Sequence, residues 1–177
     1  MIAPPLTLPS AFARLAAALA LAGALAGCTN MTQVPAGTPL ADVEAQWGRP
    51  NFFCDRPDGG RRVIWTQQPM GQYAWGTNVT PDGRVGPVVS ILRDEHFRLL
   101  SQGTWSAEQV RCEFGPPARV SEAGLGSSRQ VVWAYRYREA DAWNSLMYVY
   151  LGADGRQVTR FHPGPDPMYD DERFFGL

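Results

Sequence analysis

The sequence repeats itself once, and an internal duplication constrains the fold more than any single motif. A Gly-Thr pair, a Val followed by Gly-x-Pro, a Val-x-Trp and an Asp-Gly-Arg triplet occur twice in the same order. The matched positions are Gly37 and Gly103, Val43 and Val110, Gly48 and Gly115, Pro50 and Pro117, Trp65 and Trp133, and Asp82 and Asp154. Their separation only increases along the chain, as small insertions in the second copy would produce. We therefore expect two tandem copies of one structural unit, over 37–92 and 93–162.

Each copy is expected to begin with a short helix. Thr38 as N-cap with Pro39 at the first helical position predicts the first start, and a capping box from Ser106 to Gln109 predicts the second. The repeated Gly-x-Pro ends both helices, because glycine adopts the left-handed conformation of a C-terminal cap and proline blocks continuation. A further helix is predicted over 93–101.

Strands follow the helices in each copy. Asp-Gly pairs at Asp58, Asp82 and Asp154 predict tight turns, and residues 131–138 and 145–151 alternate as half-buried strands do. The expected fold class is α+β, with the helices of each unit on one face of an antiparallel sheet. The segment 163–177 is rich in Pro, Gly and acidic residues and is predicted to be an extended acidic tail.

The N-terminus is typical of a secretory signal. Arg14 is followed by a run of Ala, Leu and Gly that is too short to span a bilayer, and the run ends in Leu25-Ala26-Gly27-Cys28. That ending resembles the lipobox of bacterial lipoproteins, which implies cleavage after residue 27, acylation of Cys28 and a lipidated tether over 28–36. Thr29 replaces the Asp that retains such proteins in the inner membrane, so the resemblance implies an outer-membrane location facing the periplasm.

The rest of the chain offers no recognisable catalytic set. Nucleophile elbows, zinc-protease and phosphate-loop patterns are missing, so we expect neither an enzyme nor a cofactor or metal site. His96 is predicted to be a solvated helical residue, and His162 to precede a mobile acidic tail. Without Arg14 the net charge is near −2 and is mixed along the chain, which disfavours a nucleic-acid partner.

Two cysteines remain in the mature chain, Cys54 and Cys112. In an oxidising periplasm they could form one disulfide between the two copies, but two buried thiols fit the sequence nearly as well.

A candidate protein-binding surface follows from strand alternation. If Met147, Val149 and Leu151 face the helices, Tyr148 and Tyr150 lie on the opposite face of the sheet. Two arginines of the preceding strand, Arg136 and Arg138, are then expected to flank the tyrosines, because buried unpaired charges are costly. Exposed Tyr beside Arg is typical of interface hot spots. The alternative is that another layer covers these tyrosines.

The lipobox, the Gly-Thr start, the Val-containing helix, Gly-x-Pro, Val-x-Trp and Asp-Gly-Arg together resemble the SmpA/OmlA, or BamE-like, outer-membrane lipoproteins. Residues 103–158 match best. The resemblance implies two helices on an antiparallel sheet and an accessory role in the assembly of outer-membrane barrels. The duplication departs from that single-copy accessory and is similar in layout to the β-lactamase-inhibitor protein fold, in which two units share a continuous concave sheet.

The sequence thus predicts a non-catalytic lipoprotein that binds outer-membrane lipid through Cys28. Its protein partner is expected among periplasmic or outer-membrane proteins, barrel-assembly components included. The expected role is accessory or scaffold in envelope assembly. The alternative is a periplasmic protein-binding or inhibitory module that uses the open sheet face.

Overall fold

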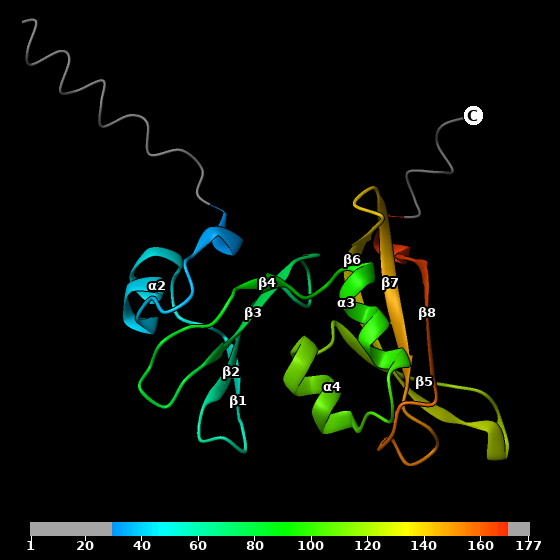
Figure 1. The fold of residues 1–177 in the computed structure, drawn as a ribbon. Coiled ribbons are helices and arrows are strands. Elements are labelled where there is room, and N and C mark those ends of the chain that lie inside the picture. The colour runs from blue at the N-terminus through cyan, green and yellow to red at the C-terminus, as the bar shows by residue number, and fades with distance from the viewer. Residues whose placement is uncertain (1–29, 170–177) are drawn as a thin grey trace, which may run out of the picture. The chain divides into compact units, whose positions relative to one another are not determined.

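The computed structural model describes residues 30–169, and the lipobox and the last eight residues lie outside this range. The fold is α+β with two separate four-stranded antiparallel sheets (Figure 1). The first sheet contains β1 (Phe52–Asp55), β2 (Arg61–Thr66), β3 (Ala74–Val79) and β4 (Val89–Ser90). The second contains β5 (Arg119–Ala123), β6 (Gln130–Glu139), β7 (Trp143–Tyr150) and β8 (Arg160–Pro165). The strands of each sheet follow one another in chain order. The predicted tandem repeat is confirmed. The expectation of a continuous concave sheet is wrong, because the two repeats form separate sheets.

Each repeat contains one eight-residue helix, α2 (Leu40–Trp47) in the first and α4 (Ala107–Phe114) in the second. The capping box of Ser106 and Gln109 is present at the start of α4. The start of α2 differs from prediction, because Pro39 is the N-cap and Thr38 bonds the carbonyl of Pro35 instead. A third helix, α3 (Asp94–Phe97), continues as a 3-10 turn, η3 (Arg98–Ser101), as predicted for 93–101.

The helix ends are equivalent in the two repeats. Gly48 and Gly115 both have φ of 80°, which a residue with a Cβ rarely adopts. In each repeat an aromatic side chain of the second strand donates to the carbonyl of this glycine, Trp65 in the first and Tyr135 in the second. Burial raises the pKa of Tyr135, since its phenol lies deep in the core.

The two Asp-Gly-Arg turns hold the starts of the helices. The chain after each turn bridges the residue before the helix, Arg84 with Pro39 and Gln157 with Ser106. These triplets, which recur in the sequence, thus have the same structural role in both copies.

The helices of the second repeat lie between the two sheets (Figure 1). Phe97 of α3 and Phe114 of α4 share one core with Tyr135 on the second sheet and with Ile64 on the first. The other face of the first sheet packs Val63 and Trp65 in a core with Val43 of α2. The prediction of helices on one face therefore holds for the second sheet, whereas helices cover both faces of the first. Among the elements of residues 30–169, only the second sheet keeps a face that no helix covers.

Both predicted end segments are shorter than expected. The 3-10 turn η2 (Met31–Gln33) packs onto the first repeat through the buried Met31, so the tether predicted over 28–36 ends at about residue 30. At the other end, β8 runs to Pro165 and a 3-10 turn, η5 (Pro167–Tyr169), follows. Asp166 is almost fully buried against Arg136, which holds this segment in place, so the prediction of an extended tail from residue 163 is wrong as far as residue 169.

In the described part of the chain, no helix is both long enough and apolar enough to cross a bilayer.

Candidate functional site

The face of the second sheet turned away from the helices carries the predicted tyrosines. Met147, Val149 and Leu151 lie in the core shared with the helices, so Tyr148 and Tyr150 lie on the other face, as the alternation predicts. The strand register places Tyr148 between Ala134 of β6 and His162 of β8.

The two tyrosines differ in exposure. Tyr148 is half-buried, and its ring contacts the His162 ring at a centroid distance of 5.6 Å. Tyr150 is only 9% exposed, because the Arg160 guanidinium lies 3.6 Å above its ring and His162 lies 5.4 Å away. The Tyr150 hydroxyl and His162 Nε2 are 3.2 Å apart, within hydrogen-bonding distance. The expectation that Tyr150 is exposed is therefore wrong: a layer contributed by β8 covers it.

The predicted arginines Arg136 and Arg138 lie on the face of the tyrosines, because they alternate along β6 with Ala134, the register partner of Tyr148, but both are bonded within the fold. Arg136 donates to buried Asp166 at 2.7 Å and to the carbonyl of Pro69, and its side chain is 16% exposed. Arg138 donates to Asn144 and to the carbonyl of Asp141. Both arginines thus hold together parts of the fold, and neither is free to meet a partner.

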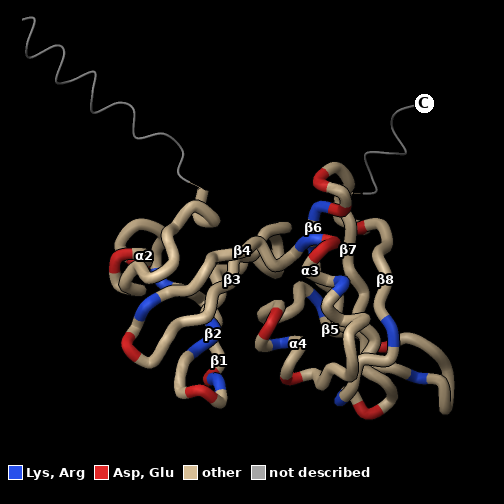
Figure 2. The backbone as a smooth tube through the Cα atoms, viewed as in Figure 1, with Lys and Arg blue, Asp and Glu red and all other residues tan. Residues whose placement is uncertain are grey.

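Two further arginines lie on the same face. Arg160 covers Tyr150, and Arg119 of β5 is the register partner of Ala134, which in turn pairs with Tyr148. Both are exposed, and within residues 30–169 neither forms an ion pair with a carboxylate. Strand β8 contains the basic residue Arg160 and no acidic residue (Figure 2). We call Arg119, Tyr148, Tyr150, Arg160 and His162 the Tyr148 face.

Small residues make room for these rings. A Cβ added to Gly164 would approach the Tyr148 ring to 3.0 Å, and Ala134 lies on the opposite side of the same ring in the register. Tyr148 therefore has a small neighbour on each flanking strand, Ala134 on β6 and Gly164 on β8. Nothing in the local sequence around 119 or 160 indicates this role, because both residues reach the face only through strand pairing.

The cysteines form a disulfide between the repeats. Cys54 of β1 and Cys112 of α4 have a Cα–Cα distance of 5.7 Å, which is usual for such a bond. An open groove of about 600 Å³ lies beside it, with Trp105 and Glu108 on the α4 side and Arg56 and Pro57 on the β1 side. The bonded cysteines leave no free thiol in the groove.

A partly buried polar cluster of Arg62, His96 and Glu113 lies between the repeats, next to the disulfide. The Glu113 carboxylate accepts from Arg62 of β2 at 2.7 Å and lies 2.6 Å from Nε2 of His96 of α3. Desolvation by burial lowers the pKa of Arg62, and the charge of Glu113 opposes that shift. The space for the guanidinium exists because residue 76 is glycine, whose added Cβ would lie 2.8 Å from the Arg62 side chain. The interpretation of His96 as a solvated surface residue is wrong, since its ring also packs edge-on against Phe114.

Other chemistry-bearing residues hold the fold together. Asp94 accepts from the Tyr137 hydroxyl and from the backbone of Ala140, which joins α3 to the β6–β7 hairpin. Within the described range 30–169, no group of three or more His, Cys, Asp or Glu residues is placed to hold a metal ion.

Comparison with known proteins adds little to this geometry. No family model matches the chain, and no curated protein matches it. Among solved structures, the chain is similar to a DUF4309 family protein (YjgB) from Bacillus subtilis, at 17% sequence identity over 73% of this chain and 83% of that one. The TM-score is 0.27, which is too low to indicate a shared fold or function.

Proposed function

We propose that this chain is an outer-membrane lipoprotein that faces the periplasm and binds another envelope protein, as a non-catalytic accessory of outer-membrane protein assembly. The observation that carries the binding role is the Tyr148 face. It presents two arginines without ion-pair partners among the described residues, next to a half-buried tyrosine, on a sheet face that no helix of residues 30–169 covers. Tyr and Arg dominate the binding energy of protein interfaces.

The disulfide supports an exported protein. Bonds of this kind persist in the periplasm and are rare in the reducing cytosol. Together with the lipobox resemblance at Cys28, the Cys54–Cys112 bond favours an envelope location.

The partner is expected to present an acidic or aromatic surface. The Tyr148 face carries Arg119, Arg160 and His162 and no carboxylate, so an acidic strand or loop of a periplasmic or outer-membrane protein would be electrostatically complementary. Barrel-assembly components are the partners that the BamE-like motifs favour. A shared concave surface across both repeats is not available for an inhibitory role, because the sheets are separate.

Site-specific photo-crosslinking tests the binding role. A photoreactive phenylalanine analogue at position 148 should crosslink in living cells to one envelope protein, identified by mass spectrometry. The same analogue at Leu125, which is 88% exposed in the β5–β6 connection, is the matched control. With the purified partner, Tyr148→Ala and Arg160→Ala should each weaken binding about tenfold or more. Equal crosslinking from both positions, or unchanged affinity, would refute the assignment of this face.

Palmitate labelling tests the anchor. The full chain expressed in a Gram-negative host should incorporate labelled palmitate, and Cys28→Ala should abolish the incorporation. Labelling that survives this substitution would contradict the lipoprotein assignment.

A further inference from the structure

Four exposed apolar side chains gather at one end of the folded body. Eight large hydrophobic residues in the described range are exposed, and four of them belong to this group. Met70, Tyr73, Trp143 and Met168 are 63%, 43%, 61% and 42% exposed. We call these four residues the Trp143 edge.

Hydrogen bonds between the two repeats hold the Trp143 edge together. The Gln68 side chain bonds both backbone groups of Arg136, at 2.8 and 3.2 Å, and Arg136 in turn binds Asp166. Gln72 donates to the Asn144 side chain at 2.8 Å. Each apolar residue of the edge lies within two positions of a residue in this network. The edge is therefore a fixed platform rather than a set of loose loops.

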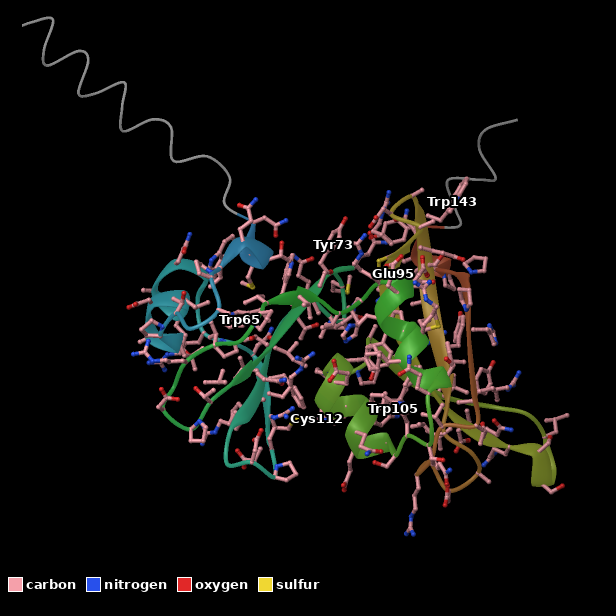
Figure 3. All side chains as sticks on the ribbon, in the orientation of Figure 1. Trp65, Tyr73, Glu95, Trp105, Cys112 and Trp143 are labelled. Carbon is pink, nitrogen blue, oxygen red and sulfur yellow. A yellow bond between two sulfur atoms is a disulfide. The ribbon has the colours of Figure 1, made fainter. Side chains whose placement is uncertain are left out.

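The N-terminal end of the folded body belongs to the same end of the molecule. Met31 shares a core cluster with Trp75, and the Trp75 ring stacks on Tyr73 at 6.0 Å. In one common view, the blue start of the described chain, Tyr73 and Trp143 all lie at the upper end (Figures 1 and 3).

The chain between Cys28 and this end is very short. Only Thr29 and Asn30 lie between Cys28 and Met31, so three Cα–Cα steps connect them. A fully extended chain covers at most about 3.6 Å per residue, so Cys28 lies within roughly 11 Å of Met31. An acyl chain on Cys28 would hold this end of the folded body at the membrane surface.

We propose that the Trp143 edge lies in the headgroup region of the bilayer that holds the acylated Cys28. The inference rests on the proposed lipid anchor. Trp and Tyr are the side chains that concentrate at the membrane–water interface, because their rings are apolar and their polar groups remain hydrated. Near the edge, Arg93 forms an ion pair with Asp141, and Arg138 donates hydrogen bonds to Asn144 and to the Asp141 carbonyl, so both guanidinium groups keep protein partners when the edge contacts lipid.

The anchor makes a weak contact sufficient. Once Cys28 is inserted, the edge meets the membrane at a high effective concentration, so a patch that would not bind vesicles alone stays docked. Docking fixes the orientation of the protein, and the β5–β6 connection at the lower end of Figure 1 then points into the periplasm.

Tryptophan quenching tests the inference. The acylated protein, purified after expression of the full chain, is reconstituted into phosphatidylethanolamine and phosphatidylglycerol vesicles whose acyl chains carry bromine. Bromine should quench part of the fluorescence, and Trp143→Phe should remove most of the quenched fraction. Adding Leu125→Trp to that variant moves a tryptophan to the β5–β6 connection and should not restore the quenching.

The possible outcomes distinguish a failure of the proposed lipid anchor from a failure of the proposed membrane contact. A chain that takes up no palmitate and does not float with vesicles refutes the proposed anchor, and this inference with it. A chain that is acylated and floats, but whose quenching is unchanged by Trp143→Phe, refutes the membrane contact alone. Quenching of Trp143 that appears only after deletion of residues 170–177 would show that the C-terminal segment covers the edge, which also overturns the inference.

Discussion

The Cys54–Cys112 bond should supply a large share of the stability of the folded body. The two cysteines are 58 residues apart. Chain-entropy reasoning gives about 4 kcal/mol for a cross-link that closes a loop of this length in the unfolded chain. For a domain of this size, 1 kcal/mol shifts the thermal midpoint by about 2–4 °C, so loss of the bond should lower the midpoint by roughly 8–16 °C.

The unfolding transition should nevertheless remain single. Ile64 and Ala74 of the first repeat pack in the same core as Phe97 and Phe114 of the second. This shared core couples the repeats whether or not the cysteines are bonded. Removal of the bond should therefore shift the transition without splitting it.

The assay is calorimetric unfolding of three samples: the oxidised protein, the reduced protein, and the variant that combines Cys54→Ala with Cys112→Ala. The variant and the reduced protein should agree, and reductant should have no further effect on the variant. Two alkylatable thiols in the unreduced protein besides Cys28, or a midpoint change below about 2 °C, would refute the entropic estimate. Two separate transitions in the variant would refute the shared core.

Three further predictions concern buried polar groups. Glu113→Ala should destabilise the protein by about 3 kcal/mol or more in denaturant titration, because it leaves Arg62 buried without its partner; Glu113→Gln should cost less. Burial raises the pKa of Tyr135 and Tyr137, so ultraviolet titration should show both remaining protonated above the ordinary value of 10.0. Because the unfolded chain loses these protons more easily, the stability that the two phenols contribute is complete below pH 10.0 and declines above it. Titration of all six tyrosines of the folded protein near pH 10.0 would contradict this. Tyr150→Ala should cost about 2–3 kcal/mol, since the ring is buried, whereas Tyr150→Phe should cost about 1 kcal/mol or less; equal effects would show that only the hydroxyl matters.

Local chemistry explains what could be predicted from the sequence. The capping box at Ser106, the glycines that end the helices and the Asp-Gly turns act through neighbouring backbone groups, so a short window of sequence contains all their determinants. The alternation in β7 depends only on strand geometry, which is why the side of Tyr148 was predictable. The repeat itself predicted two units of the same fold class.

Contacts between distant segments explain the rest. Arg160 and Arg119 reach the Tyr148 face through strand register, and Glu113 of α4 meets both His96 of α3 and Arg62 of β2. The order of residues 163–169 depends on Asp166 finding Arg136, about 30 positions away. No local pattern encodes such pairings, because they form only when the core brings the segments together.

The sequence alone determined the duplication, the element types, the ends of the helices and the alternating faces of the strands, since each of these follows from a local backbone preference or a periodicity. Only the tertiary structure decided which faces stay exposed. The helices of the second repeat pack against both sheets and α2 packs on the other side of the first, so within residues 30–169 only the second sheet keeps a face without a helix. That choice depends on how two hydrophobic surfaces far apart in the chain bury each other, which is a property of the assembled core.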